Sequence, residues 1–332
     1  MTLRSTTVAA STAVWLLVSS AARAEPSVWT QAARPATQRL ANALDEADRL
    51  LSEDLQLWLN EPATSSRRVP LLNRARQALE KVGPEHATDL ELRFRLGEVY
   101  YSLYDVEEDH RRLEQAAEHL TFVADAVAPV TMRAEALKDL AICYARLGKH
   151  RDEIETYDRA LAVEPHPGSR AILLANRAEG HMVQGDILSA VRGYRQSLRE
   201  TPSTLVHRSG VTTLWGLAVA LDRSGDLRGA LEHIAQARAY DPADQNINSP
   251  SWFYVPDYDD SWYAALGHWS RARTAANRDL ELDEYRDAVA AWRRYLDHAP
   301  ISDHWLPLAS LRLRQCEKEL DEALAKPPPK RQ

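Results

Sequence analysis

Apolar residues recur at helical spacing along most of this chain, so that successive segments each place one apolar stripe on a helix face. Two such stripes precede Gly83-Pro84. The first runs through Leu40, Leu44, Ala47, Leu51, Leu55 and Trp58, and the second through Leu71, Leu72, Ala75, Ala78 and Leu79. The stripes predict two helices, and we interpret residues 25–83 as a degenerate helical hairpin at the start of the fold.

A fixed set of residue types recurs three times further along the chain. The distance from an aromatic-type position to a closing proline is 21 residues in every copy, namely Tyr144–Pro165, His181–Pro202 and Leu221–Pro242. Each copy also has a glycine four residues after the first position, where a helix would end in left-handed backbone. Proline ends the second helix because it cannot continue the hydrogen-bond ladder. The constant spacing therefore predicts three packed helix pairs.

These copies resemble the tetratricopeptide repeat, a 34-residue helix–turn–helix unit, and carry most of its small, glycine, alanine, aromatic and proline positions. They depart from it at Glu153, where the family has a small residue. Two weaker copies flank them, from Leu96-Gly97 to Pro129 and from Leu266-Gly267 to Pro300. The resemblance implies an all-α fold, a right-handed superhelical solenoid of tetratricopeptide-like helix–turn–helix repeats over residues 84–300.

The end of the chain predicts one more helix, from Trp305 to Leu324, which we interpret as a capping helix within residues 301–325. We expect the tail, residues 326–332, to be unstructured. The capping helix carries a set of charged residues that we expect on its polar outer face: Arg312, Arg314, Glu317, Lys318, Glu319 and Asp321.

The first residues have the features of an export signal. Arg4 is the only early charge, residues 5–22 are uncharged, and Ala22-Arg23-Ala24 has the pattern of a signal-peptidase site. We therefore expect a signal peptide over residues 1–24, a mature chain starting at Glu25 in the bacterial periplasm or outside the cell, and no membrane insertion after cleavage. An uncleaved anchor and a cytoplasmic chain are the alternatives; the Ser and Thr residues of the uncharged run match a membrane-spanning helix poorly.

Composition and motifs exclude several classes of function. The 332 residues include 41 Lys+Arg and 48 Asp+Glu, a net charge of −7, without the basic clusters that nucleic acid requires. Common catalytic motifs are absent and the 11 histidines lack metal-ligand spacing, so we expect no nucleic-acid partner, no enzyme, no metal and no cofactor. Asp257, Asp259 and Asp260 indicate a solvated acidic loop. Cys143 and Cys316 indicate two separate reduced thiols, because units of a solenoid touch only their neighbours.

The resemblance also implies a binding surface, since this family binds peptides or proteins on the concave face formed by first helices. Carried over by position, the candidate residues there are Phe94, Tyr101, Lys138, Arg146, Glu179, Trp215 and Arg223. For each of them, a solvent-facing residue without a ligand is the alternative.

The stretch from Trp252 to Trp269 is unusually aromatic, and Pro250 just before it and Pro256 in its first half exclude a regular helix there. We interpret residues 243–262 as an insertion between repeats that folds toward the concave face near Trp215. Trp252, Tyr254 and Trp262 would then join the partner site, since Trp and Tyr dominate binding hot spots. The alternative is that these rings only fill a mismatch between repeats.

Together these features favour an exported repeat scaffold that binds another protein or peptide in the cell envelope. A small-ligand or glycan receptor that uses the same concave pocket is the second interpretation, and an enzyme without a recognisable motif is the third.

Overall fold

A computed structural model describes residues 35–60, 66–249 and 254–326. Over these ranges the protein consists of 13 α-helices with short 3₁₀ and π turns and contains no strand. The predicted signal peptide, most of the tail and Trp252 lie outside the described residues.

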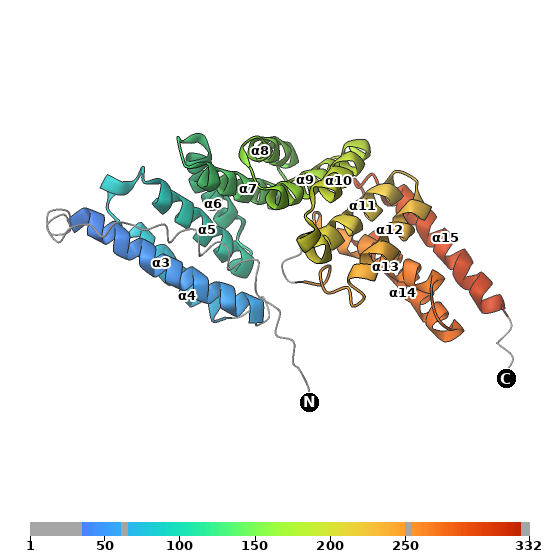
Figure 1. The fold of residues 1–332 in the computed structure, drawn as a ribbon. Helices are drawn as coiled ribbons and strands as arrows, with labels where there is room; N and C mark the ends of the chain where they lie inside the picture. The colour runs from blue at the N-terminus through green and yellow to red at the C-terminus, as the bar shows by residue number, and fades with distance from the viewer. Residues whose placement is uncertain (1–34, 61–65, 250–253, 327–332) are drawn as a thin grey trace, which may run out of the picture.

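Twelve of the helices form six successive antiparallel pairs, and α15 follows alone. The helices are α3 (Pro35–Asn60), α4 (Arg68–Glu80), α5 (Leu90–Glu107), α6 (His110–Asp125), α7 (Val130–Arg146), α8 (His150–Val163), α9 (Pro167–Val183), α10 (Ile187–Glu200), α11 (Val211–Arg223), α12 (Leu227–Tyr240), α13 (Asp260–Arg273), α14 (Arg278–His298) and α15 (Leu306–Ala325). Figure 1 shows the pairs stacked into an arch, with α3 and α4 at one end and α14 and α15 at the other. The fold is an all-α solenoid of tetratricopeptide-like hairpins.

The turns inside the three best repeats form as predicted. Gly148, Gly185 and Gly225 have φ angles of 69°, 81° and 95°, the left-handed region that glycine adopts without a steric penalty. The amide after each glycine donates a hydrogen bond of 2.9 Å to the carbonyl five residues earlier, which closes the same helix-ending motif three times. The second helices end at Val163, Glu200 and Tyr240, each two residues before its proline.

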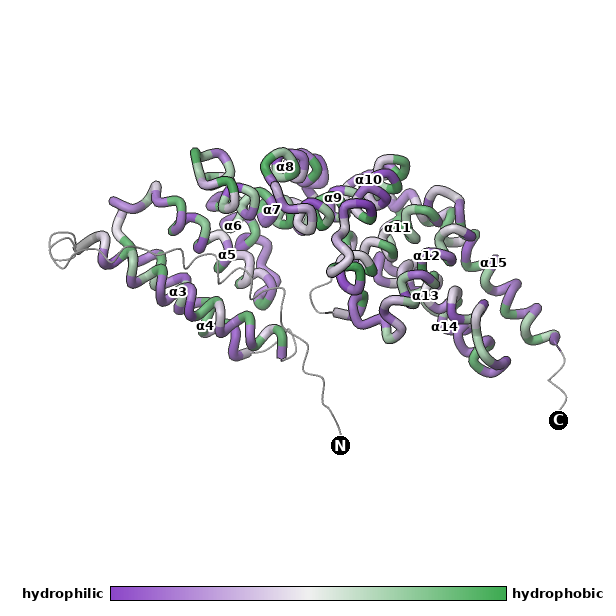
Figure 2. Tube along the Cα trace, viewed as in Figure 1, coloured by the Kyte–Doolittle hydropathy of each residue, from purple (hydrophilic) through white to green (hydrophobic). Residues whose placement is uncertain are grey.

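Two apolar cores run through the arch, and they meet at α9. One core extends from Leu40 to Leu173, and the other from Ala178 to Ala323. Figure 2 shows apolar and polar residues alternating along the helices, as expected for helices that bury one stripe. Within the described ranges, no helix is both long and apolar enough to cross a membrane.

The last helix does not behave as a simple cap. Arg312, predicted on a polar outer face, is 4% exposed, and its Nε lies 2.6 Å from Asp222 of α11, two repeats away. Glu319 also faces inward and accepts hydrogen bonds of 2.9 Å from Trp269 and Tyr285. Of the six charged residues, Arg314, Lys318 and Asp321 are exposed. The expectation of an outer face for Arg312 and Glu319 was wrong, because α15 folds back against the preceding helices.

This fold-back also limits the rule that solenoid units touch only their neighbours. His304, just before α15, lies so close to the turn at Gly185 that a Cβ added to Gly185 would lie 3.1 Å from its Nε2. Cys143 and Cys316 are nevertheless both buried and free, one in each core.

Candidate functional site

Four of the predicted binding residues lie on one surface, which we call the first-helix face: Tyr101, Lys138, Arg146 and Glu179. We define it by Glu98, Tyr101 and Asp105 of α5, Glu135, Lys138, Asp139 and Arg146 of α7, and Glu179 of α9. All eight side chains are partly exposed. Arg146 joins α5 to α7, since it pairs with Asp105 at 3.5 Å and lies over the rings of Tyr101 and Tyr104.

Carboxylates outnumber basic groups on the first-helix face. Lys138 pairs with Glu135 and Asp139, and Arg95 at its edge pairs with Glu98 at 2.7 Å. Burial, together with the nearby carboxylates of Asp139 and Asp48, nevertheless raises the pKa of Glu98 to about 7. Burial also raises the pKa of Asp139 and that of Glu179, where Glu153 and Asp259 add to the effect. Burial on this face therefore disfavours the ionised forms of Glu98, Asp139 and Glu179.

Four predicted binding residues are buried instead. Phe94 is 8% exposed, Trp215 3%, Arg223 6% and Trp262 0%, so these side chains belong to the interior. Their burial corrects the expectation that they line an open surface. Trp262, placed at the end of the predicted insertion, lies in α13 and packs edge-on against Trp292 and Tyr295 at 4.9 Å.

One of the three acids in the loop before α13 is buried, whereas a solvated loop was predicted. Asp259 is 1% exposed and lies 2.7 Å from Arg223, whose guanidinium is stacked between Trp262 and Trp305. Of the three loop acids, Asp257 and Asp260 remain exposed. A buried carboxylate requires a paired cation, and Arg223 supplies it.

The segment that joins α12 to α13 is described over residues 241–249 and 254–259, and these parts fold against the preceding repeats. Besides the Arg223–Asp259 pair at its end, Asn246 donates a hydrogen bond of 3.0 Å to the His207 carbonyl near the start of α11. Tyr254 and Trp215 line the same cavity, of about 510 Å³. The segment thus lies near Trp215, and Tyr254 is half-buried there.

This cavity is a groove along one face of α13. The helix contributes residues at spacings of three and four, which share one face: Asp260, Tyr263, Ala264, Gly267, His268 and Arg271. The other walls are formed by Trp215 and Arg238 and by five residues of the segment, namely Asp244, Ile247, Asn248, Ser249 and Tyr254. We call this cavity the α13 groove.

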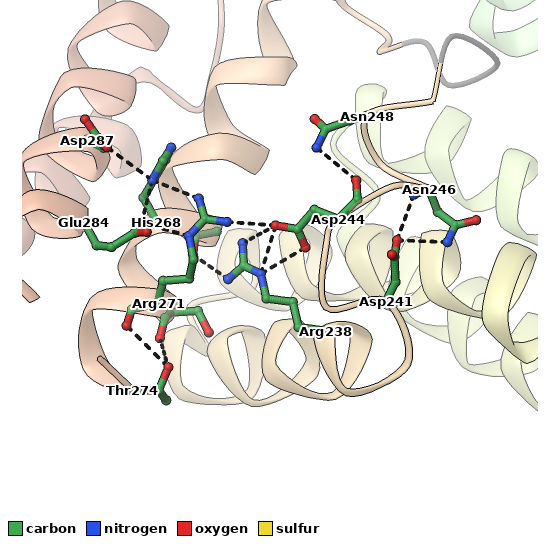
Figure 3. Close-up of polar contacts among 12 residues, drawn as sticks. Arg238, Asp241, Asp244, Asn246, Asn248, His268, Arg271, Thr274, Glu284 and Asp287 are labelled. Atoms are coloured by element: carbon green, nitrogen blue, oxygen red, sulfur yellow. Dashed lines mark hydrogen bonds and ion pairs between the residues drawn. The ribbon is translucent and has the colours of Figure 1, made fainter. Parts of the chain in front are cut away.

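A charged network holds one end of the α13 groove together (Figure 3). Asp244, at a φ of 53°, accepts hydrogen bonds from Arg238 at 3.0 Å and from Arg271 at 2.8 Å. Arg271 also donates to Glu284 at 2.8 Å, and His268 lies 2.7 Å from the same carboxylate. Arg238 lies over the Trp215 ring at 5.1 Å. The charged groups of this network are therefore paired with one another.

Sequence reasoning missed the polar residues of this groove. Asp260, His268 and Arg271 occur at helical spacing within and just after the aromatic stretch, a signal that could have marked them as one face. Arg238 and Asp244 carried no such signal, because only the path of the segment brings them to α13. Across the described ranges, no three His, Cys, Asp or Glu side chains converge in a way that could hold a metal ion.

No protein-family model matches this chain, and no curated protein matches it in sequence. Three solved structures are similar in fold. One, described as a Podosopora anserina kinesin light chain with nearly identical TPR-like repeats, has a TM-score of 0.44 and 21% identity over 64% of this chain and 98% of its own. BtubC (BKLC) from P. vanneervenii has a TM-score of 0.45 and 16% identity, and the match covers 80% of this chain and 94% of its own. The apo form of RapI has a TM-score of 0.48 and 13% identity, and the match covers 85% of this chain and 100% of its own. Similarity at this level does not extend to function.

Proposed function

We propose that this protein is a non-catalytic scaffold that binds a segment of another protein on its first-helix face. The observation that carries the proposal is the open, acid-rich surface of α5, α7 and α9, where Glu98, Asp139 and Glu179 are partly buried and their charges are disfavoured. A partner's cation would compensate these charges, so the preferred partner is a segment that carries lysine or arginine.

The first repeats suit this role better than the last ones. Around α11 the corresponding face is covered, and every residue of that helix except Thr212 is buried. On the first-helix face, Tyr101, Lys138 and Arg146 are partly exposed, whereas Trp215 and Arg223 of α11 are only 3% and 6% exposed.

The test uses two charge-matched double variants as bait in an extract of the cell envelope. Glu98→Gln with Glu179→Gln removes two carboxylates from the first-helix face, and recovery of the specific partner should fall at least tenfold. Glu114→Gln with Glu118→Gln removes two exposed carboxylates of α6 and should leave recovery unchanged. Equal recovery by both double variants would exclude the first-helix face as the binding site.

The cellular location belongs to the proposal as well. The pattern of residues 1–24 supports export to the periplasm or beyond the cell. N-terminal sequencing of the native protein should then begin at or near Glu25, and a soluble chain that starts at Met1 or Thr2 would contradict export.

A further inference from the structure

The α13 groove has two chemically different ends. Its α13 wall is about 16 Å long, because Asp260 and Arg271 are eleven residues apart and each helical residue adds 1.5 Å. At the Arg271 end, all six guanidinium nitrogens of Arg238 and Arg271 already contact acceptors within the protein: the Asp244 and Glu284 carboxylates, the Gly267 carbonyl and the His268 ring. Both cations at this end are therefore already paired with carboxylates of the protein.

The opposite end carries an unneutralised acid. Asp260 is exposed, accepts a hydrogen bond of 2.8 Å from the Ser261 hydroxyl, and forms no ion pair with any residue that the structure describes. The carboxylate lies in the first turn of α13. A ligand with a positive charge would therefore gain a partner here without displacing an internal contact.

Aromatic rings form the wall beside this acid. Tyr254 of the segment and Tyr263 of α13 meet at 5.2 Å, with their planes at 63°. The same half of the protein also places its own arginines over tryptophan rings; for example, Arg238 lies 5.1 Å from the centre of Trp215 and Arg223 lies 4.6 Å from that of Trp262. Rings next to a carboxylate suit a cation with an aliphatic stem.

We propose that the α13 groove binds a cationic side chain, a guanidinium or ammonium group on a peptide, with its charge at Asp260 and its stem along Tyr254 and Tyr263. The inference rests on the groove alone and does not require a partner on the first-helix face. A neutral polar ligand would leave Asp260 without a cation, and an anion would meet the carboxylates of Asp244 and Asp260.

The test titrates the ¹⁵N-labelled full chain with the capped peptide Ac-Gly-Arg-Gly-NH₂ and follows the tryptophan indole signals by NMR. Trp215, assigned through Trp215→Phe, lines the groove, and its signal should shift and saturate at millimolar peptide. The citrulline peptide has nearly the same shape without the charge and should bind at least fivefold more weakly.

Two charge-matched variants localise the effect. Asp260→Asn keeps the side-chain shape and should weaken binding of the arginine peptide at least fivefold. Asp279→Asn removes an exposed first-turn acid of the next helix, outside the groove, and should leave binding unchanged. Equal binding of the citrulline peptide, no effect of Asp260→Asn, or no binding at all would each overturn the proposal. None of these results bears on partner recovery through Glu98 and Glu179, so the two proposals fail separately.

Discussion

The two halves of the arch are built from the same kind of helical hairpin, but one half exposes the surface of its first helices and the other half covers it. From α5 to α9, first helices present partly exposed charged residues such as Glu98 and Lys138. From α11 to α15, the equivalent surface is covered by the described parts of the segment before α13, residues 241–249 and 254–259, and by α15. The repeat motif therefore specifies the hairpin and leaves the exposure of its first helix to the segments that follow it.

The two halves also differ in how deeply their ion pairs are buried. The covered half pairs Arg312 with Asp222 and Arg223 with Asp259 at side-chain exposures of 5% or less. On the first-helix face, the pairs stay partly exposed, with side chains at 20% to 33% for Glu135 and Lys138. Buried pairs lock helices together, whereas partly exposed ones can be exchanged for contacts with a partner.

The largest expected effect comes from breaking a buried pair in the covered half. Arg312→Ala should lower the free energy of unfolding by about 3–5 kcal/mol, because Asp222 would remain buried without a cation. Urea unfolding followed by tryptophan fluorescence measures this, since six of the nine tryptophans lie at or beyond position 215.

Arg293→Ala is the control on the neighbouring helix. Its pair with Glu317 is 61% and 37% exposed, so the loss should stay below about 1 kcal/mol. Adding Asp222→Asn to Arg312→Ala should restore part of the lost stability. Similar losses for Arg312→Ala and Arg293→Ala would show that the fold-back of α15 contributes little.

A smaller effect should appear in the open half as a dependence on pH. The pKa of Glu98, about 7 in the folded chain, exceeds the ordinary value of 4.5, so the folded state binds more protons between these values. The free energy of unfolding should therefore fall as pH rises from about 4.5 to 7 and change no further through this group above 7.

Glu98→Gln should remove this part of the decline, a difference of about 1 kcal/mol or more between pH 4.5 and pH 8, as one pKa unit corresponds to about 1.4 kcal/mol. Unfolding by urea, followed by circular dichroism at several pH values, measures it. Glu114→Gln, on the outer helix α6, should keep the wild-type slope. If the free energy of unfolding of Glu98→Gln depended on pH as in the wild type, folding would not raise the pKa of Glu98.

The smallest effects should be equal in the two halves. Gly148 and Gly225 have positive φ angles, and a Cβ added at either would meet no atom within 4 Å. Gly148→Ala and Gly225→Ala should each cost about 1 kcal/mol from backbone strain alone, measured as the shift of the urea midpoint. A much larger loss at Gly225 would mean that the covered half depends on its turns as well as on its buried pairs.

Local sequence patterns were sufficient for the helical hairpins. Gly148 and Pro165 act on the backbone within a few residues, so their effect does not depend on the rest of the fold. The same short range explains why the residues of the first-helix face could be placed: helical spacing puts Tyr101 and Lys138 on the exposed side of their helices.

Local patterns could not predict which side chains are buried in the helices beyond α9. Arg223 has the spacing of a surface position, but Asp259 and Trp305 cover it from segments 36 and 82 residues further along the chain. Arg312 lies on the charged side of its helix, and only the position of Asp222 turns it inward. Helical period determines which residues share a face, whereas the path of the whole chain determines what covers that face. That path depends on contacts between distant residues, which no local pattern records.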